Sequence, residues 1–484
     1  MGSTPSSMRS AMARLADLAV LEEIEVGPPV IEKRRLRIPY RVGERHTTLT
    51  FRYAEDVFDP DEPADQNLAA FLGAQLVLNY GLFAKRIALR GRFDAADRAF
   101  LAEHLENTSR EIAANKLYGG HNAFLREPAS RLEPEVKERY TAAELVFPDP
   151  VAPAVPPGRP PLADFPGPVA VLASGGKDSL LTQGLLEELG CEVHALFVNE
   201  SGRHWLTALE GWRHLSATRP QRTARVWTDC DRLYNWFLRQ FPFIRPDFQR
   251  VRADHYPLRL WTVAVFLTAV LPLVRKRGLT RIFIGDEFDT TRLVDLRWPG
   301  GVLRHYDGVY DQSRFFDERF TRWYADKGWP LVQASLLRPL SELAIQVTLA
   351  DRYPALLRAQ VSCHAASVRG GRVRPCGRCE KCRRIVGGLL AGGADPGLAG
   401  YDPPAIGRCL ADLARLPINQ DAETSAHLRW VLRQQGQLPD SALPAAPHPE
   451  VLAPRFDPLC CPPDWLAADV RGPLLALFST MRRG

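Results

Sequence analysis

Residues 174–179 have the types and the order needed to bind an anion. They read Ser-Gly-Gly-Lys-Asp-Ser, follow the apolar run 169–173 and precede a helical pattern at 180–189. Two adjacent glycines let the backbone turn sharply, and the free amides and partial positive charge of a helix N-terminus favour phosphate. Lys177 adds a mobile cation, the two serines add hydroxyl donors, and Asp178 adds a carboxylate for Mg²⁺ or for the helix cap.

This loop differs from the two most common phosphate loops. A Walker loop requires an earlier glycine and a Ser or Thr after Gly-Lys, whereas Val171 and Asp178 occupy those positions here. The Gly-x-Gly-x-x-Gly fingerprint of dinucleotide-binding folds is absent as well. The alternative is a Gly-Gly turn without a ligand, but both serines, the aspartate and the strand–helix context favour a phosphate site.

A second chemical signal is a cluster of cysteines. Cys376, Cys379 and Cys382 have C-x-x-C-x-x-C spacing, and Cys363 lies upstream of them. Four thiolates suit a closed tetrahedral Zn²⁺ site, which is structural rather than catalytic. An iron–sulfur cluster and free thiols are the alternatives, and His364 is a possible substitute ligand.

Composition limits the class of protein. The chain has 484 residues, 45% of them hydrophobic and 24% charged, with a net charge of +6. This mild charge gives no support for a nucleic-acid partner, and an anionic small molecule fits it equally well. No apolar run reaches the ~20 residues that span a bilayer, and the N-terminus lacks a secretory signal pattern. We therefore expect a cytoplasmic protein without a membrane partner, whose nine cysteines are metal ligands or buried thiols.

Alternating apolar runs in the second half of the chain predict the fold. Strands are expected at 169–173, 193–198, 223–228 and 281–285, and helices at 179–189, 204–217, 231–240 and 258–276. This alternation indicates an α/β fold with a doubly wound parallel sheet, in which ligands bind beyond the carboxyl ends of the strands. Polar residues follow each strand there: 174–179, 199–201, Asp229, and Asp286 with Glu287.

Composition also divides the chain into segments. The prolines between 147 and 168 would stop helices and form a semi-rigid spacer. Before them, strands are expected at 23–26, 36–40, 48–51 and 86–89, and helices at 66–80 and 95–115. The predicted segments are a flexible N-terminus (1–20), a smaller α+β accessory domain (21–146), a Pro-rich linker (147–168), the α/β domain (169–394) with its zinc motif (363–382), and a helical C-terminal extension (395–484).

The two motifs in this order resemble one enzyme family. The sequence of residues 174–179 is similar to the SGGxDS loop of the PP-loop (HUP-type) ATP pyrophosphatases. With the downstream cysteines, residues 169–392 resemble the 7-cyano-7-deazaguanine synthase (QueC-like) family of queuosine and archaeosine precursor synthesis. The family's Pro-Gly-Arg-Asn stretch resembles 257–260, which keeps Arg259, and its Tyr-Pro-Asp-Cys-Arg stretch resembles 310–314, which keeps Tyr310 and Arg314. A family lysine falls on Leu343.

The resemblance implies a C–N bond-forming ligase that uses ATP and Mg²⁺, with Zn²⁺ in the cysteine motif. ATP would adenylate the carboxylate of 7-carboxy-7-deazaguanine and release pyrophosphate, and an amine would then displace AMP. The implied catalytic residues are Lys177, Asp178, Arg259 and Arg314. The implied ATP-binding residues are Ser174, Gly175, Gly176, Lys177, Asp178, Ser179 and Asn199. Candidates for the deazaguanine ring are Asp286, Glu287, Asp289, Tyr310 and Asp311.

Two acceptors are compatible with this first half-reaction. Ammonia would give an amide and, after a second activation, a nitrile. The extra N-terminal region and the diverged pocket motifs resemble the enzymes of antiphage operons (type IV CBASS and Qat), in which a protein amine could collect the acyl group. The N-terminal region would then hold the acceptor, for example an operon-encoded partner such as a CBASS nucleotidyltransferase.

Two functions of other kinds are also compatible with the sequence. A PP-loop tRNA sulfurtransferase would need a catalytic thiol near the loop, and Cys230 is the nearest candidate. A catalytically weak nucleotide-binding scaffold with a zinc knuckle would account for the missing lysine at position 343.

Overall fold

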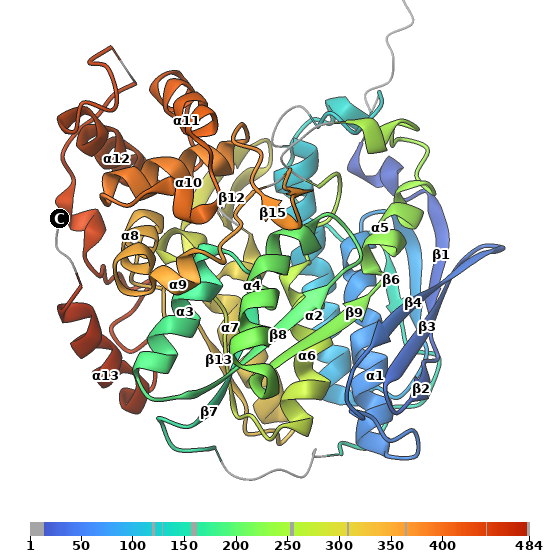
Figure 1. Cartoon of the computed structure of the whole chain (residues 1–484). Coiled ribbons are helices and arrows are strands. Elements are labelled where there is room, and N and C mark those ends of the chain that lie inside the picture. The colour runs from blue at the N-terminus through green and yellow to red at the C-terminus, as the bar shows by residue number, and fades with distance from the viewer. Residues whose placement is uncertain are drawn as a thin grey trace, which may run out of the picture.

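The computed structural model describes residues 14–118, 122–127, 129–155, 162–251, 256–306, 309–363, 365–441 and 443–481. Parts of the expected flexible N-terminus and Pro-rich linker, and the candidate ligand His364, lie outside these residues. The described chain forms one central mixed sheet with helices packed on both of its faces (Figure 1).

The second half of the chain builds the parallel part of this sheet. Its strands are β7 (Pro168–Ala173), β8 (Glu192–Asn199), β9 (Thr223–Thr228), β10 (Arg281–Phe283) and β13 (Val332–Ala334). They are parallel neighbours in the spatial order β13-β10-β7-β8-β9. The chain therefore moves outward from β7 in one direction and later returns to the other side of β7. Such a reversal is the topological switch point at which open α/β sheets bind ligands.

The N-terminal strands extend this sheet instead of forming one of their own. They are β1 (Leu21–Val26), β2 (Val30–Glu32), β3 (Arg35–Val42), β4 (Arg45–Arg52), β5 (Ala84–Leu89) and β6 (Glu144–Val146). Strand β4 pairs antiparallel with β9, with Phe51 opposite Thr228. Beside this joint, the Asp229 carboxylate accepts the backbone N–H of Thr50 at 2.7 Å. Asp229, expected among the polar residues of the ligand crevice, thus fastens the two parts of the sheet together.

Alternate residues along the strands contact different hydrophobic cores. Val169 and Val171 of β7 belong to one core, and Ala170 between them belongs to the other. This alternation follows from the two-residue repeat of a strand. The N-terminal elements and the second face of β7–β9 share one core, so the described N-terminal region packs as part of the same body as the α/β region.

The helices divide between these two faces. Those on the face of Val169 and Val171 are α3 (Lys177–Glu188), α4 (His204–Thr218), α8 (Glu342–Arg352), α9 (Pro354–Leu357), α10 (Glu380–Ala391), α11 (Pro403–Arg415) and α13 (Ala468–Ser479). Those on the face of Ala170 are α1 (Pro63–Gln75), α2 (Ala95–Ile112), α5 (Cys230–Leu238), α6 (Val263–Lys276) and α7 (Arg314–Asp326). Helix α12 (Ala422–Gln434) packs with α8 and α10 in a smaller core.

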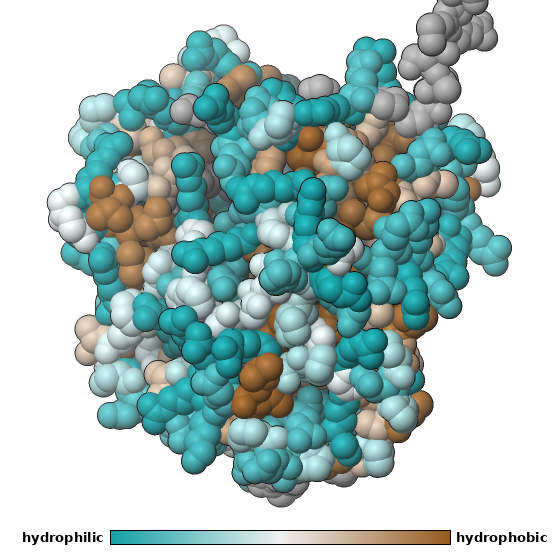
Figure 2. Space-filling model, turned by 90° about the vertical axis from the view of Figure 1, so that its right-hand side faces the viewer, coloured by the Kyte–Doolittle hydropathy of each residue, from teal (hydrophilic) through white to brown (hydrophobic). Residues whose placement is uncertain are grey.

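Two hairpins lie outside the main sheet. They are β11–β12 (Leu293–Trp298 with Gly301–Tyr306) and β14–β15 (Ser367–Arg369 with Arg372–Arg374). The surface is mostly polar on the face drawn in Figure 2, where hydrophobic residues form separate patches between hydrophilic ones.

Helix α6 begins later than its sequence pattern predicts. The apolar run favours a start at 258, whereas the helix starts at Val263. The Asp311 carboxylate accepts the N–H groups of Thr262 and Val263, each at 2.7 Å. The Asn79 side chain accepts the N–H groups of the two preceding residues at 2.9 and 3.0 Å. Distant side chains therefore satisfy the free N–H groups at the start of this helix.

The joint between β4 and β9 gives a first testable prediction. Phe51 is 1% exposed, and Phe51→Ala should destabilise the fold by about 3–5 kcal/mol. Because β4 and β9 share hydrogen bonds and a core, amide hydrogen exchange should accelerate in both strands. Phe456→Ala is the matched control, because the Phe456 side chain is 45% exposed. It should leave the amides of β4 and β9 protected from exchange. Acceleration in β4 alone would contradict a continuous sheet.

Candidate functional site

The loop 174–179 lies at the switch point of the sheet. It connects β7 to α3, and the residues after β10 pack against it. Gly175 has a φ of +71°, and a Cβ there would lie 2.8 Å from the Thr207 carbonyl oxygen of α4. A Cβ at Gly285 would lie 2.8 Å from the carbonyl carbon of Asp178. Glycine is needed at both positions because backbone or helix approaches the loop from each side.

The two serines hold the loop in shape. Ser179 Oγ accepts the backbone N–H of Ser174 at 3.2 Å and lies 3.2 Å from Ser174 Oγ. Ser174 Oγ in turn accepts the N–H of Gly176 at 3.3 Å. Helix α3 begins directly afterwards at Lys177, with Gly176 as its cap residue. The expected ATP-binding residues other than Asn199 are thus assembled as a compact turn at a helix N-terminus.

Lys177 is buried rather than mobile. Its Nζ lies 2.5 Å from Asp178 Oδ1, 3.0 Å from Glu287 Oε2 and 3.5 Å from Glu342 Oε1. Asp178 is its neighbour in the loop, Glu287 follows β10, and Glu342 begins α8. The side chain is only 6% exposed. The expectation of a mobile cation therefore gives way to an ammonium ion that joins three elements around the loop.

Electrostatics keep this lysine charged. Burial lowers the pKa of Lys177, but the three carboxylates outweigh burial and hold that pKa above its ordinary value. Burial raises the pKa of Glu342, and Lys177 with Arg384 more than offsets this, leaving it at about 2. At neutral pH both groups are therefore ionised. Asp289 lies beside them. Its pKa is raised to about 6, mainly by burial and to a smaller extent by the negative charge of Glu342.

The four cysteines expected to bind zinc come together. The Sγ atoms of Cys363, Cys376, Cys379 and Cys382 all lie within 4.8 Å of one another. The Cys376–Cys382 and Cys379–Cys363 separations are 3.8 and 3.9 Å. Zn–S bonds of about 2.3 Å in a tetrahedron place sulfurs roughly 3.8 Å apart. The cluster could therefore hold a metal such as zinc.

Backbone amides and a glycine support this cluster. Cys363 Sγ accepts the N–H of Cys376 at 3.2 Å, and Cys376 Sγ accepts that of Cys379 at 3.3 Å. Such bonds stabilise thiolates. Gly377 has a φ of +64°, and a Cβ there would lie 2.5 Å from the Ala405 Cβ. Helix α10 begins with Cys379 as its cap residue.

A cavity of about 490 Å³ lies beside the loop. Thr207, whose carbonyl approaches Gly175, lines this cavity, as does Cys363 of the metal cluster. The Val361 N–H donates to the Gly175 carbonyl at 3.3 Å, so the cysteine segment also contacts the loop. The cavity therefore has the phosphate-type loop and the metal cluster as neighbours.

Arg259 is the predicted catalytic residue that lines this cavity. Its guanidinium lies over the rings of Tyr256 and Tyr234, 3.5 and 4.2 Å from their centroids. Nη1 lies 3.3 Å from Asp231 Oδ1. The Nε–H has no hydrogen-bond partner among the described residues. Two aromatic faces thus orient a cation at the wall of the cavity.

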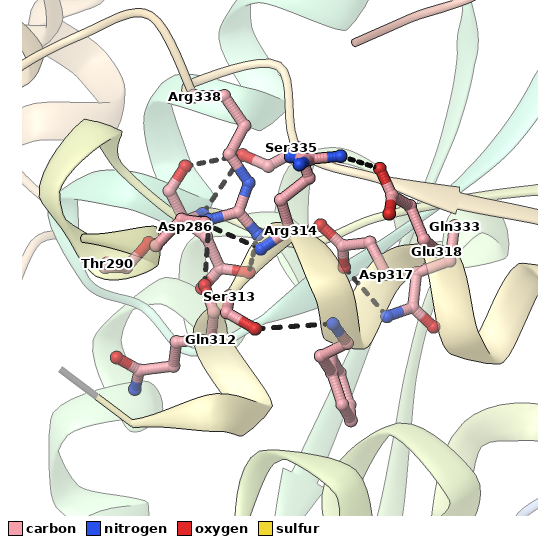
Figure 3. Close-up of polar contacts among 12 residues, drawn as sticks. Asp286, Thr290, Gln312, Ser313, Arg314, Asp317, Glu318, Gln333, Ser335 and Arg338 are labelled. Carbon is pink, nitrogen blue, oxygen red and sulfur yellow. Dashed lines mark hydrogen bonds and ion pairs between the residues drawn. The ribbon is translucent and has the colours of Figure 1, made fainter. Parts of the chain in front are cut away.

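The remaining predicted residues lie elsewhere. Asn199 Oδ1 accepts the N–H of Ser201 at 2.9 Å and shapes the turn after β8. Asp286 pairs with Arg338 at 3.3 Å, and Arg338 also contacts Asp317 at 2.7 Å (Figure 3). Arg314 points to Glu318 (Figure 3), and its Nε–H donates to the carbonyl of Leu459 at 3.0 Å. Within the described residues, none of these side chains lines the cavity of Arg259.

Tyr310 and Asp311 have structural surroundings. Asp311 is 2% exposed and caps α6, as described above. Tyr310 lines a second cavity of about 500 Å³, between α2 and α7. The predicted substrate set therefore separates: Glu287 lies at the loop, whereas Asp286, Tyr310 and Asp311 have other partners.

Sequence reasoning included Glu200 only within the polar stretch 199–201, and it missed the other cavity residues described here. Glu200 is 4% exposed, lines the cavity and accepts the N–H of Trp205 at 2.8 Å. Asp231 and Tyr234 lie three residues apart on α5 and so share a helix face, and Tyr256 completes the set. The polar stretch after β8 was a signal for Glu200. The tyrosines gave none, because an aromatic residue in a sequence is usually part of a core.

Comparison with protein-family models and with curated proteins returned no match to this chain. Among the helices of the described residues, none combines the length and the apolar character needed to cross a bilayer.

The cysteine cluster predicts a metal content that can be measured. We expect about one zinc ion per chain by elemental analysis and native mass spectrometry, and loss of the ion in Cys379→Ser. Cys191→Ser is the control, because this buried thiol lies outside the cluster. Iron with an absorbance band in the visible range would instead indicate an iron–sulfur cluster. Metal-free protein with four reactive thiols would overturn the prediction.

Proposed function

We propose that this chain is an ATP-dependent ligase that adenylates a planar heteroaromatic carboxylate, 7-carboxy-7-deazaguanine in the simplest case, and transfers the acyl group to an amine. The observation that carries the proposal is the cavity that holds Arg259 beside the loop 174–179. The proposed reaction would require a carboxylate in the cavity to meet an α-phosphate held at the loop.

The loop supports the nucleotide half of the proposal. The N-terminus of α3 and the glycine turn supply amides and partial positive charge for phosphate. Asp178 and Glu287 are carboxylates at the same edge of the sheet, and such oxygens are typical Mg²⁺ ligands. A bound Mg²⁺ would neutralise charge on the departing pyrophosphate.

The cavity supports the acid half. Its volume of about 490 Å³ falls within the usual range of small-molecule pockets. The guanidinium of Arg259 suits a carboxylate, and the neighbouring tyrosine faces suit a flat ring. Glu200 and Asp231 could accept hydrogen bonds from a ring N–H and an exocyclic amine.

Adenylation explains why these groups belong together. A carboxylate is a poor electrophile because its carbon is electron-rich and its leaving group would be oxide. An acyl-adenylate has AMP as its leaving group, so an amine can attack. Ammonia and a protein amine both fit this step. The N-terminal region contributes Tyr80 and Phe124 to the cavity wall, which favours a role for that region in substrate or acceptor binding.

Two other functions have less support. A sulfurtransferase would need a reactive thiol near the loop, but Cys230 is 1% exposed and burial raises the pKa of its thiol above the ordinary range. A nucleotide-binding scaffold would not need a cavity with an oriented arginine next to the loop.

Arg259 provides the test of the proposed reaction. Arg259→Lys keeps the charge but loses the planar guanidinium, and should lower kcat/KM for pyrophosphate release by about 10- to 100-fold, as for loss of a hydrogen bond to a charged group. Arg314→Lys is the matched control, because Arg314 lies outside the cavity lining, and should change this constant little. Assays contain ATP, Mg²⁺ and 7-carboxy-7-deazaguanine. No pyrophosphate from the unmodified protein would reject the proposal.

The acceptor can be identified from the products. Mass spectrometry after the same incubation, with ammonia or with candidate protein acceptors, should show the transferred acyl group. An amide or nitrile of the deazaguanine would establish ammonia as the acceptor, and a mass increase on a protein would establish an amine of that protein. Formation of AMP and pyrophosphate with no acyl product in either case would contradict transfer to an amine.

A further inference from the structure

The metal cluster and the loop 174–179 are connected through the first turn of α10. Arg384 Nη1 lies 2.6 Å from Glu342 Oε2, and Glu342 Oε1 lies 3.5 Å from Lys177 Nζ. Lys381 lies three residues before Arg384 on α10, so both project from the same helix face. That face is turned toward the loop, because Arg384 on it reaches Glu342, the partner of Lys177.

Lys381 is a second lysine on this face of α10. Burial has the largest effect on its pKa, which it lowers, and the charges of Arg384, Asp178, Lys177 and Glu342 also act on it. Its side chain is partly buried. Among the described residues, Lys381 makes no hydrogen bond and no ion pair, whereas Lys177 has three carboxylates within 3.5 Å. Lys381 is therefore available to a ligand in a way that Lys177 is not.

The cysteines fix the position of this lysine. Lys381 lies between Cys379 and Cys382, which are both members of the metal cluster. A metal held by these thiolates would fix the backbone on each side of Lys381 before any ligand arrives. Such preorganisation lowers the entropy that a flexible lysine loses when it binds. Arg378 belongs to the same motif, but its side chain is exposed to solvent, whereas that of Lys381 is partly buried.

We propose that Lys381 binds the triphosphate of ATP, and that the metal motif serves as the device that positions it. This inference rests on the proposed function. In the adenylation step a carboxylate oxygen forms a bond to the α-phosphorus. The bond from that phosphorus to the oxygen bridging it to the β-phosphorus breaks, and its electron pair leaves with pyrophosphate. No proton is transferred. Lys381 stabilises the charge on the phosphate oxygens with a charge-assisted hydrogen bond.

The proposal gives the cysteine motif a second role. A closed metal site contributes to folding wherever it lies in a chain. Here the motif also carries a cation toward the carboxyl ends of β7 and β10, which are paired neighbours in the sheet. Lys177 holds the elements of the loop together, and Lys381 contacts the ligand.

Titration calorimetry with ATP and Mg²⁺ tests this proposal without relying on turnover. Lys381→Met should weaken ATP binding about 10-fold or more, as expected for loss of a charge-assisted hydrogen bond to phosphate. Lys381→Arg should restore most of the affinity because it restores the positive charge. Arg378→Met removes an exposed cation from the same motif and should bind ATP as the unmodified protein does. Zinc content and circular dichroism should be unchanged in all three variants.

The outcomes separate this inference from the proposed function. Unchanged ATP affinity in Lys381→Met, in a protein that binds ATP and releases pyrophosphate, overturns the role of Lys381 alone. Equal weakening in Lys381→Met and Arg378→Met overturns it too, because general charge would then explain both. Absence of ATP binding in the unmodified protein rejects the proposed function and this inference with it. If the Lys381→Met protein loses its zinc, the test uses Lys381→Gln protein that retains zinc, and the same criteria apply to it.

Discussion

The ammonium group of Lys177 holds the candidate site together. A buried charge is tolerated only when it is paired, and removing one partner of such a pair commonly destabilises a protein by about 3–5 kcal/mol. Here the partners come from three elements: the loop after β7, the residues after β10, and the first turn of α8. Glu342 extends the network to Arg384 in α10. The geometry of the loop therefore depends on the packing of α8 and α10, and through α10 on the cysteine cluster.

The continuous sheet has a comparable effect on the cavity. Since β4 pairs with β9 and Asp229 accepts the N–H of Thr50, the N-terminal region is fixed against the α/β region. Tyr80 and Phe124 can then form a wall of the same cavity as Arg259. A loosely tethered N-terminal module could not contribute to a pocket of fixed shape. The N-terminal region is thus part of the wall of this cavity.

Features that depend on local sequence could be predicted, whereas features that depend on contacts between distant residues could not. Strands such as β7 and β8 were predictable because buried parallel strands have short continuous apolar runs. The cysteine cluster was predictable because metal-binding spacing is local along the chain. The start of α6 was not, because its caps, Asp311 and Asn79, are far away in the sequence. The role of Asp311 was missed for the same reason: a carboxylate that follows a polar stretch gives no sign that it will cap a helix.

Under the proposed function, Lys177 alone would not balance the charge of a triphosphate at this loop. Lys177 is already neutralised by carboxylates, so it adds little net positive potential for a triphosphate. Arg384 likewise already has two acidic partners, Glu342 and Glu380. A triphosphate would add several negative charges to this cluster, and Mg²⁺ is the usual counter-charge in phosphate-binding sites. The carboxylates that hold Lys177 are also the groups that could bind this ion. The same side chains would therefore fix the loop before ATP arrives and share its counter-ion afterwards.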